Sequence, residues 1–271
     1  MGIGARSSLW RRMALRSLSS AYLRRKCKTP DGSFQAYVSG GSSLKVLDPR
    51  GLTIEPVHQR FIRDWIKPGA TVWDIGANLG LFALPAALKV RQGKVYAFEP
   101  DVELAANLLR SLRLKANQGL NVSLFCLAIS GADGTANFQI SAFSRAMNKL
   151  AAVGKWHDAE VKVLETRSVA TLTIDTLAKS LSPPAVIKID VEGAEVNVLE
   201  GGKATIDRYR PTMLIEGPSE LWDSMGAFLG EHDYVILDGA EEQQLPLDHP
   251  VWDTVAVPRE RFFMNGETTT R

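Results

Sequence analysis

The chain has 271 residues, of which 45% are hydrophobic and 23% charged, so it can bury a full core and is not a disordered, fibrous or disulfide-stapled protein. Its net charge of +2 conceals an asymmetry, because residues 1–30 hold eight basic residues and no acid, which leaves 24 basic and 30 acidic residues, or −6, for residues 31–271. A mildly acidic body argues against binding to nucleic acid, so affinity for an anionic surface is expected only in the head.

Residues 1–30 are expected to form a basic N-terminal extension. Arginines interrupt each apolar stretch before it reaches the length of a secretory signal, and no run approaches the roughly 20 apolar residues that span a bilayer. The Arg- and Ser-rich head fits a transit peptide, a basic helix in peripheral contact with an anionic membrane, or a solvated tail. The two cysteines, Cys27 and a Cys126 expected to be buried, favour a reducing compartment. The expected location is cytoplasmic, with peripheral membrane or organelle targeting as alternatives.

Residues 31–68 are expected to form a leading subdomain that ends in a helix near Val57–Ile66, and 69–260 the main domain, followed by a polar tail at 261–271. Strands are predicted at Thr71–Ile75, Lys94–Phe98, Asn121–Ala128, Ala185–Ile189, Thr212–Ile215 and Tyr234–Leu237, and helices at Leu79–Val90 and Val102–Ala116. This alternation predicts an α/β fold with a parallel sheet and helices on both faces. Strand-like pieces at Ala136–Ile140 and Glu160–Val169 flank a polar loop and indicate an insertion between the third and fourth strands.

The first chemical motif is a strand that runs into a glycine-rich turn and a helix, VWDIGANLG at 72–80. Gly76 and Gly80 permit a sharp turn and close approach of a ligand, because neither carries a Cβ atom. A dinucleotide site has the spacing G-x-G-x-x-G for contact with a pyrophosphate. Here Asp74 precedes the first glycine and Asn78 lies inside the turn. A carboxylate repels a pyrophosphate but suits an ammonium or sulfonium group, which favours S-adenosylmethionine over NAD.

The second motif is Glu99, which ends the next strand 23 positions after Gly76. An acid at this point is placed to accept both ribose hydroxyls of an adenosine. The alternative is an N-terminal helix cap, since Pro100 and Asp101 suit a first helical turn. The glycine-rich turn upstream favours ribose binding.

The third motif comprises Asp190, Glu192 and Glu216, which fall at or just past the ends of two expected neighbouring strands. That edge of an open α/β sheet is where ligands bind. Crowded acids there can raise one another's pKa and supply a general base, or hold a divalent cation through oxygen ligands, for which Asp190 and Glu216 are the candidates. Helix capping and ordinary solvation are the alternatives.

Together these residues resemble the FkbM-type S-adenosylmethionine-dependent methyltransferases. The resemblance covers roughly residues 50–257 and rests on five segments, WDIGANLGLFA (73–83), VYAFEPD (95–101), LTIDTL (172–177), IKIDVEGAEVNVLEG (187–201) and PTMLIEG (211–217). It implies a Rossmann-like, doubly wound, mostly parallel sheet of seven strands. It also implies transfer of a methyl group to a hydroxyl of a small molecule, sugar or polysaccharide.

The resemblance also implies roles for single residues. It puts Asp74, Gly76, Ala77, Asn78 and Gly80 around the methionine part of the cofactor. Glu99, with Pro100 beside it, would bind the ribose, and Asp190 and Glu192 would face the transferred methyl group.

Methyl transfer is an in-line displacement, so the enzyme mainly has to align the acceptor oxygen and exclude water. Asp190 is expected to orient or deprotonate the acceptor, with Glu192 or a divalent cation as an assistant. His157, in the inserted loop, is the competing base. His58 shows no pairing pattern and is expected to be structural.

Two other functions are compatible with these patterns. One is a nicotinamide-dependent oxidoreductase, disfavoured by Asp74 and by the missing third glycine. The other is a non-catalytic module that binds the cofactor or docks on acidic lipid through its basic head.

Overall fold

The computed structural model describes residues 22–39, 51–141, 148–151 and 162–266. Its main sheet has eight strands in the order β13-β12-β14-β11-β10-β3-β4-β5 within these residues. The strands are β3 (Thr71–Ile75), β4 (Lys94–Phe98), β5 (Val122–Phe125), β10 (Val186–Ile189), β11 (Thr212–Glu216), β12 (Tyr234–Asp238), β13 (Pro246–Leu247) and β14 (Asp253–Pro258). All six strands predicted from the sequence are present.

The prediction of seven mostly parallel strands was wrong in the number of strands and in the direction of those at one edge of the sheet. The strands from β5 to β11 run parallel, whereas β14 lies antiparallel between β11 and β12, and β13 pairs antiparallel with β12. The chain from β12 to β14 contains no crossover helix, and a direct connection of this kind joins antiparallel strands. The two residues of β13 are too few to produce a periodic pattern.

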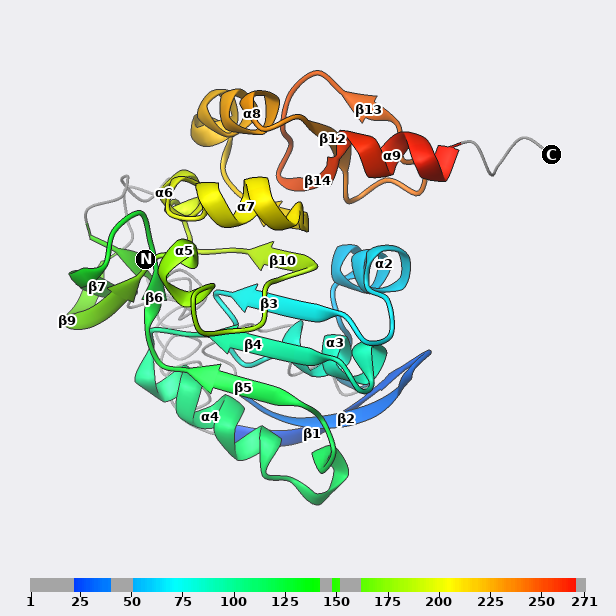
Figure 1. Cartoon of the computed structure of the whole chain (residues 1–271). Helices are drawn as coiled ribbons and strands as arrows, with labels where there is room; N and C mark the ends of the chain where they lie inside the picture. The colour runs from blue at the N-terminus through cyan, green and yellow to red at the C-terminus, as the bar shows by residue number, and fades with distance from the viewer. Residues whose placement is uncertain (1–21, 40–50, 142–147, 152–161, 267–271) are drawn as a thin grey trace, which may run out of the picture.

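Helices cover both faces of this sheet, because the side chains of each strand alternate between two cores (Figure 1). Val72 and Val186 face one core, whereas Trp73 and Ile187 face the other. The first core is covered by α2 (Pro56–Trp65), α3 (Ala83–Val90) and α4 (Val102–Leu112), and the second by α5 (Ile174–Leu177), α6 (Glu195–Glu200), α7 (Lys203–Tyr209) and α8 (Trp222–Glu231). The last helix is α9 (Arg259–Gly266), and two short 3-10 helices are η2 (Lys115–Asn117) and η4 (Ser219–Leu221). No helix in the described part of the chain is long and apolar enough to cross a bilayer.

Strands β1 (Tyr22–Thr29) and β2 (Gly32–Ser39) form an antiparallel hairpin that spans the expected boundary at residue 30. Cys27 is buried in it, and the Asn117 side chain bonds both the N–H and the C=O of Gln35 on β2. Four of the eight basic head residues therefore belong to a strand packed on the domain. The other four lie outside the described residues. The prediction that Cys126 is buried was wrong, because β5 is the edge strand and ends one residue earlier.

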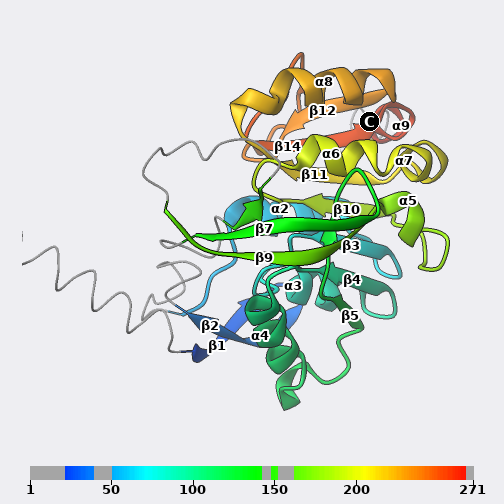
Figure 2. The same ribbon diagram turned by 90° about the vertical axis from the view of Figure 1, so that its left-hand side faces the viewer.

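The predicted insertion forms a separate curled sheet between β5 and β10. Its strands are β6 (Ala128–Ile129), β7 (Gly134–Ser141), β8 (Lys149–Leu150) and β9 (Val163–Leu172), in the order β6-β9-β7-β8. Figure 2 shows β7 and β9 passing in front of the main sheet, on the side to which the carboxyl ends of β3 and β4 point in Figure 1. The insertion therefore lies at the edge of the sheet where α/β enzymes bind ligands.

Candidate active site

The glycine-rich turn after β3 lies tightly against the end of β10. Gly76 has φ +81°, and a Cβ atom at this position would stand 1.8 Å from the carbonyl oxygen of Asp190. The N–H groups of Gly76 and Ala77 both donate to the carbonyl of Phe98 at 3.0 Å, so the turn also binds β4. Gly80 has φ +79° and packs against the side chain of Leu108 on α4. Gly80 therefore lets the turn pack closely against α4, because a Cβ atom at this position would collide with Leu108.

Glu99 joins this turn to the start of α4. Its buried carboxylate accepts hydrogen bonds from the N–H of Asn78 at 2.7 Å and from the N–H of Asp101 at 2.8 Å. Burial raises the pKa of Glu99 to about 8, although the two N–H groups oppose that shift. Asn78, at φ +50°, turns its backbone N–H toward the carboxylate. In its ionised form, each Glu99 oxygen keeps a further lone pair for a hydroxyl donor.

A pocket of about 560 Å³ opens between the glycine-rich turn, the end of β4 and the loop after β10. Its polar lining consists of Asn78, Glu99, Asn148, Asp190 and Glu192, and its apolar lining includes Phe98, Pro100, Leu104, Leu127, Phe138 and Leu150. The structure therefore brings Asn78, Glu99 and Pro100 from one side together with Asp190 and Glu192 from the other.

A buried row of charges lies beside this pocket. The sheet register sets Lys188 on β10 directly opposite Asp74 on β3. The Lys188 ammonium lies 2.8 Å from Asp190 Oδ2, 3.1 Å from the Gly76 carbonyl oxygen and 3.8 Å from Asp74 Oδ1. Burial favours a neutral lysine, but the carboxylates, Asp190 first, outweigh it and raise the pKa of Lys188. Burial also raises the pKa of Asp190, while Lys188 opposes that shift. The ammonium therefore links the glycine-rich turn to the expected base.

Asp74 is fully buried, and burial raises its pKa to about 6. Neither of its carboxylate oxygens has a hydrogen-bond partner among the described residues. Buried carboxylate oxygens without a partner are uncommon and call for an explanation from function. Lys188, which faces Asp74, supplies the nearby positive charge.

His58 on α2 and Glu216 at the end of β11 extend the row. Their side chains meet at 2.6 Å (Nε2 to Oε1), both largely buried. Burial lowers the pKa of His58, but the bond to Glu216 outweighs it and the net pKa is raised. Burial tends to raise the pKa of Glu216, and His58 more than offsets this. The prediction that His58 is merely structural missed a partner 158 residues away.

The candidate metal pair has protein cations as partners, since Asp190 binds Lys188 and Glu216 binds His58. Among the described residues no group of three or more His, Cys, Asp or Glu side chains is placed to hold a metal ion.

Glu192 lies in the loop after β10 with φ +57° and lines the pocket. Desolvation by the surrounding protein, and then the charge of Asp190, raises the pKa of Glu192 above its ordinary value, although the residue as a whole is exposed. Glu195, at the start of α6, turns back to accept the N–H groups of Val191 and Gly193, which fixes the shape of this loop. His157, the competing base, lies outside the described residues.

Sequence reasoning missed Lys188, Asn148 and the link to His58. A charged residue within the apolar strand VIKI at 186–189 was the available signal for Lys188. No local signal exists for the other two, because their partners are distant in the sequence.

The parallel sheet, the glycine-rich turn and the acid after β4 define an α/β fold of the methyltransferase type. Residues 74–236 match the model of the methyltransferase FkbM domain, and this match covers more than half of the chain. The chain belongs to this family of S-adenosylmethionine-dependent methyltransferases. This family membership rules out the alternative prediction of a nicotinamide-dependent oxidoreductase.

Several known proteins are similar to this chain. The 2-O-methyltransferase NoeI of Sinorhizobium fredii (strain NBRC 101917 / NGR234) is 28% identical over 170 residues, which cover 57% of this chain and 66% of NoeI. The crystal structure of methyltransferase FkbM from Methylobacillus flagellatus KT has a TM-score of 0.47 and 18% identity, with 74% of this chain and 47% of that chain covered. Magnesium protoporphyrin IX methyltransferase of Synechocystis PCC 6803, with bound S-adenosylmethionine, has a TM-score of 0.42 and 10% identity, over 75% and 76%. The chain therefore spans just under two thirds of NoeI and about half of the Methylobacillus protein.

The pocket residues fit S-adenosylmethionine, the cofactor of the family. Three carboxyl groups, those of Glu99, Asp190 and Glu192, line the pocket. Asp74, whose oxygens accept no hydrogen bond from a described residue, lies on β3 just before the glycine-rich turn. Carboxyl groups suit a ligand that carries sulfonium and ammonium groups, because a nearby positive charge favours their ionised form. Phe98, Pro100 and other apolar residues offer the surface that an adenine ring needs.

Proposed function

We propose that this chain transfers the methyl group of S-adenosylmethionine to a hydroxyl oxygen of a small molecule or carbohydrate. The pocket carries the proposal, because Glu99 lies on one side of it and Asp190 with Glu192 on the other. The similarity to NoeI, named a 2-O-methyltransferase, supports an oxygen acceptor.

When bound, the cofactor supplies a methyl group activated by a positively charged sulfur. Glu99 would accept the ribose hydroxyls, and the methionine part would lie along the glycine-rich turn, of which Gly76 and Asn78 line the pocket. Pro100 and Phe98 contact the adenine. In this arrangement the chain orients the methyl group and excludes water.

Asp190 orients the acceptor hydroxyl and takes its proton as the oxygen attacks. Lys188 favours the ionised form of Asp190 through a contact of 2.8 Å and holds its position. Glu192, whose pKa is raised by desolvation and by the charge of Asp190, lines the same pocket and in its protonated form donates a hydrogen bond to the acceptor. Two carboxyl groups in different environments thus take different roles.

Titration calorimetry with S-adenosylmethionine and its demethylated product tests the cofactor assignment. We expect wild type to bind both, and Gly76→Val and Glu99→Ala to bind neither detectably. If wild type binds neither ligand, or if the variants bind as wild type does, the assignment is overturned.

Single-turnover methylation tests the base, with labelled cofactor and a panel of free sugars and fractionated cell extract as acceptors. We expect Asp190→Asn to lose about 100-fold in rate while its cofactor affinity stays within a few fold of wild type. His157→Ala serves as the comparison and should retain activity. A fully active Asp190→Asn would remove Asp190 from the mechanism. Tight cofactor binding with no transfer to any acceptor would instead favour a non-catalytic binding module.

A further inference from the structure

The curled sheet forms one wall of the pocket. Phe138 on β7 and Leu150 on β8 are direct partners in the sheet register, and both line the pocket. Among the described residues of the insertion, Asn148, just before β8, contributes a polar side chain to this wall. The insertion is therefore part of the cofactor site as well as a covering layer.

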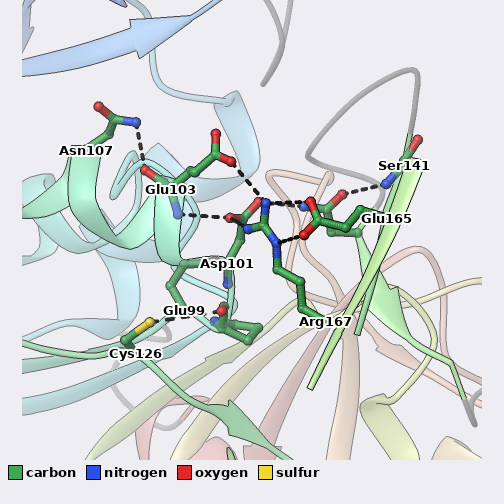
Figure 3. A network of polar contacts seen from close by, with 10 residues as sticks. Glu99, Asp101, Glu103, Asn107, Cys126, Ser141, Glu165 and Arg167 are labelled. Carbon is green, nitrogen blue, oxygen red and sulfur yellow. Dashed lines mark hydrogen bonds and ion pairs between the residues drawn. The ribbon is translucent and has the colours of Figure 1, made fainter. Parts of the chain in front are cut away.

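Arg167 on β9 links the curled sheet, through ion pairs, to acidic residues that follow β4 (Figure 3). Its Nη1 lies 3.2 Å from Asp101 Oδ1, and its Nη2 lies 3.0 Å from Glu103 Oε1 and 2.8 Å from Glu165 Oε2. Its Nε donates to Glu165 Oε1 at 2.9 Å. Asp101 is fully buried and also caps α4, so the guanidinium binds a fixed point of the main domain.

Asn148 binds the other oxygen of the Asp101 carboxylate. Its Nδ2 donates to Asp101 Oδ2 at 2.9 Å, while its Oδ1 accepts the N–H of Ser141 at 2.9 Å. The amide has two hydrogens, and its contacts with described residues use one of them. Within the described part of the chain, the second hydrogen of this largely buried, pocket-lining amide therefore has no acceptor. Asp101 in turn donates its N–H to Glu99, which connects this contact to the ribose acid.

We propose that Asn148 donates a hydrogen bond to an acceptor atom of the adenosine part of the cofactor, and that Arg167 is the positioning residue that holds Asn148 and Asp101 in place for it. The adenosine part is indicated because Asn148 is bonded to the residue that follows Glu99 and Pro100. The inference rests on the proposed function, since its ligand is the cofactor of that function.

Titration calorimetry with S-adenosylhomocysteine and with 5′-methylthioadenosine, which lacks the amino-acid part, tests this inference. We expect Asn148→Ala and Arg167→Lys to weaken binding of both ligands about tenfold, as the loss of one buried hydrogen bond implies. In turnover, Arg167→Lys should raise KM for the cofactor and leave kcat near wild type, because it acts through cofactor position.

Arg210→Lys is the matched control. Arg210 is exposed to the same degree as Arg167, 21% against 22%, and binds Glu260 in the same two-pronged manner, but it contacts the far strand β12. It should bind both ligands as wild type does, even if its melting temperature falls. Wild-type affinity in both Asn148→Ala and Arg167→Lys would overturn the inference while leaving the proposed function intact. A wild-type protein that binds neither ligand would overturn the proposed function.

Discussion

The two sides of the pocket hold their carboxylates by different means. On the side of β3 and β4, Glu99 is held by the backbone N–H groups of Asn78 and Asp101. On the side of β10 and β11, Asp190 and Glu216 are held by the side chains of Lys188 and His58. Backbone N–H groups give a fixed geometry with no net charge, whereas the charged side chain of Lys188 also adds a full positive charge that favours the ionised form of Asp190. The first arrangement suits binding of a cofactor, and the second suits a group that must accept a proton.

The largest expected effect comes from closing the turn on the first side. In Gly76→Ala the new Cβ atom collides with the Asp190 carbonyl, so we expect cofactor binding to be lost in calorimetry, together with a marked fall in melting temperature. Gly69→Ala is the control, since its φ of +83° is nearly the same but nothing lies within 4 Å of the added atom. The control should show only the cost of left-handed backbone, about 1–2 kcal/mol. Equal effects in both variants would show that strain, and not the contact with Asp190, dominates.

Removal of the buried cation tests the second side. Lys188→Met leaves the buried Asp74 and the partly exposed Asp190 without the ammonium between them, so we expect the free energy of unfolding in urea to fall by about 3–5 kcal/mol, mainly through Asp74. Lys203→Met is the control, because Lys203 binds Glu231 at a similar distance, 2.9 Å, but both side chains are exposed. Its loss should stay below about 1 kcal/mol. A Lys188→Met protein as stable as the control would contradict the electrostatic role of Lys188.

The stability of the ligand-free protein at different pH values tests the state of Glu99. Its pKa is about 8 in the folded protein and near 4.5 in an unfolded chain, so the folded state holds the proton more tightly. Stability should therefore fall as pH rises between about 5 and 8, by up to about 1.4 kcal/mol per pH unit from this group. Urea unfolding at pH 5.5 and 7.5 measures the slope, which Glu99→Gln should flatten. Glu200→Gln, an exposed change on α6, should leave the slope as in wild type.

Chelation should have the smallest effect. Because the acids on the second side already have Lys188 and His58 as partners, we expect excess EDTA to change the methylation rate less than twofold. Loss of activity that is restored by added Mg²⁺ would mean that a divalent cation takes part after all.

The sequence by itself determined the parallel half of the fold and the side of the pocket that the glycine-rich turn and Glu99 form. Strands β3, β4 and β10 are short apolar runs followed by glycine or acid, so local composition indicates both their structure and the position of Asp74, Gly76, Glu99 and Asp190. Their positions follow from backbone geometry at strand ends, which a local sequence pattern encodes.

Only the tertiary structure decided which groups neutralise and position those acids. His58 meets Glu216 across 158 positions, and Arg167 meets Asp101 across 66. The antiparallel β14 and the two-residue β13 also depend on pairing with distant strands. Side-chain contacts between remote segments form because packing brings them together, and periodicity within either segment contains no information about its partner.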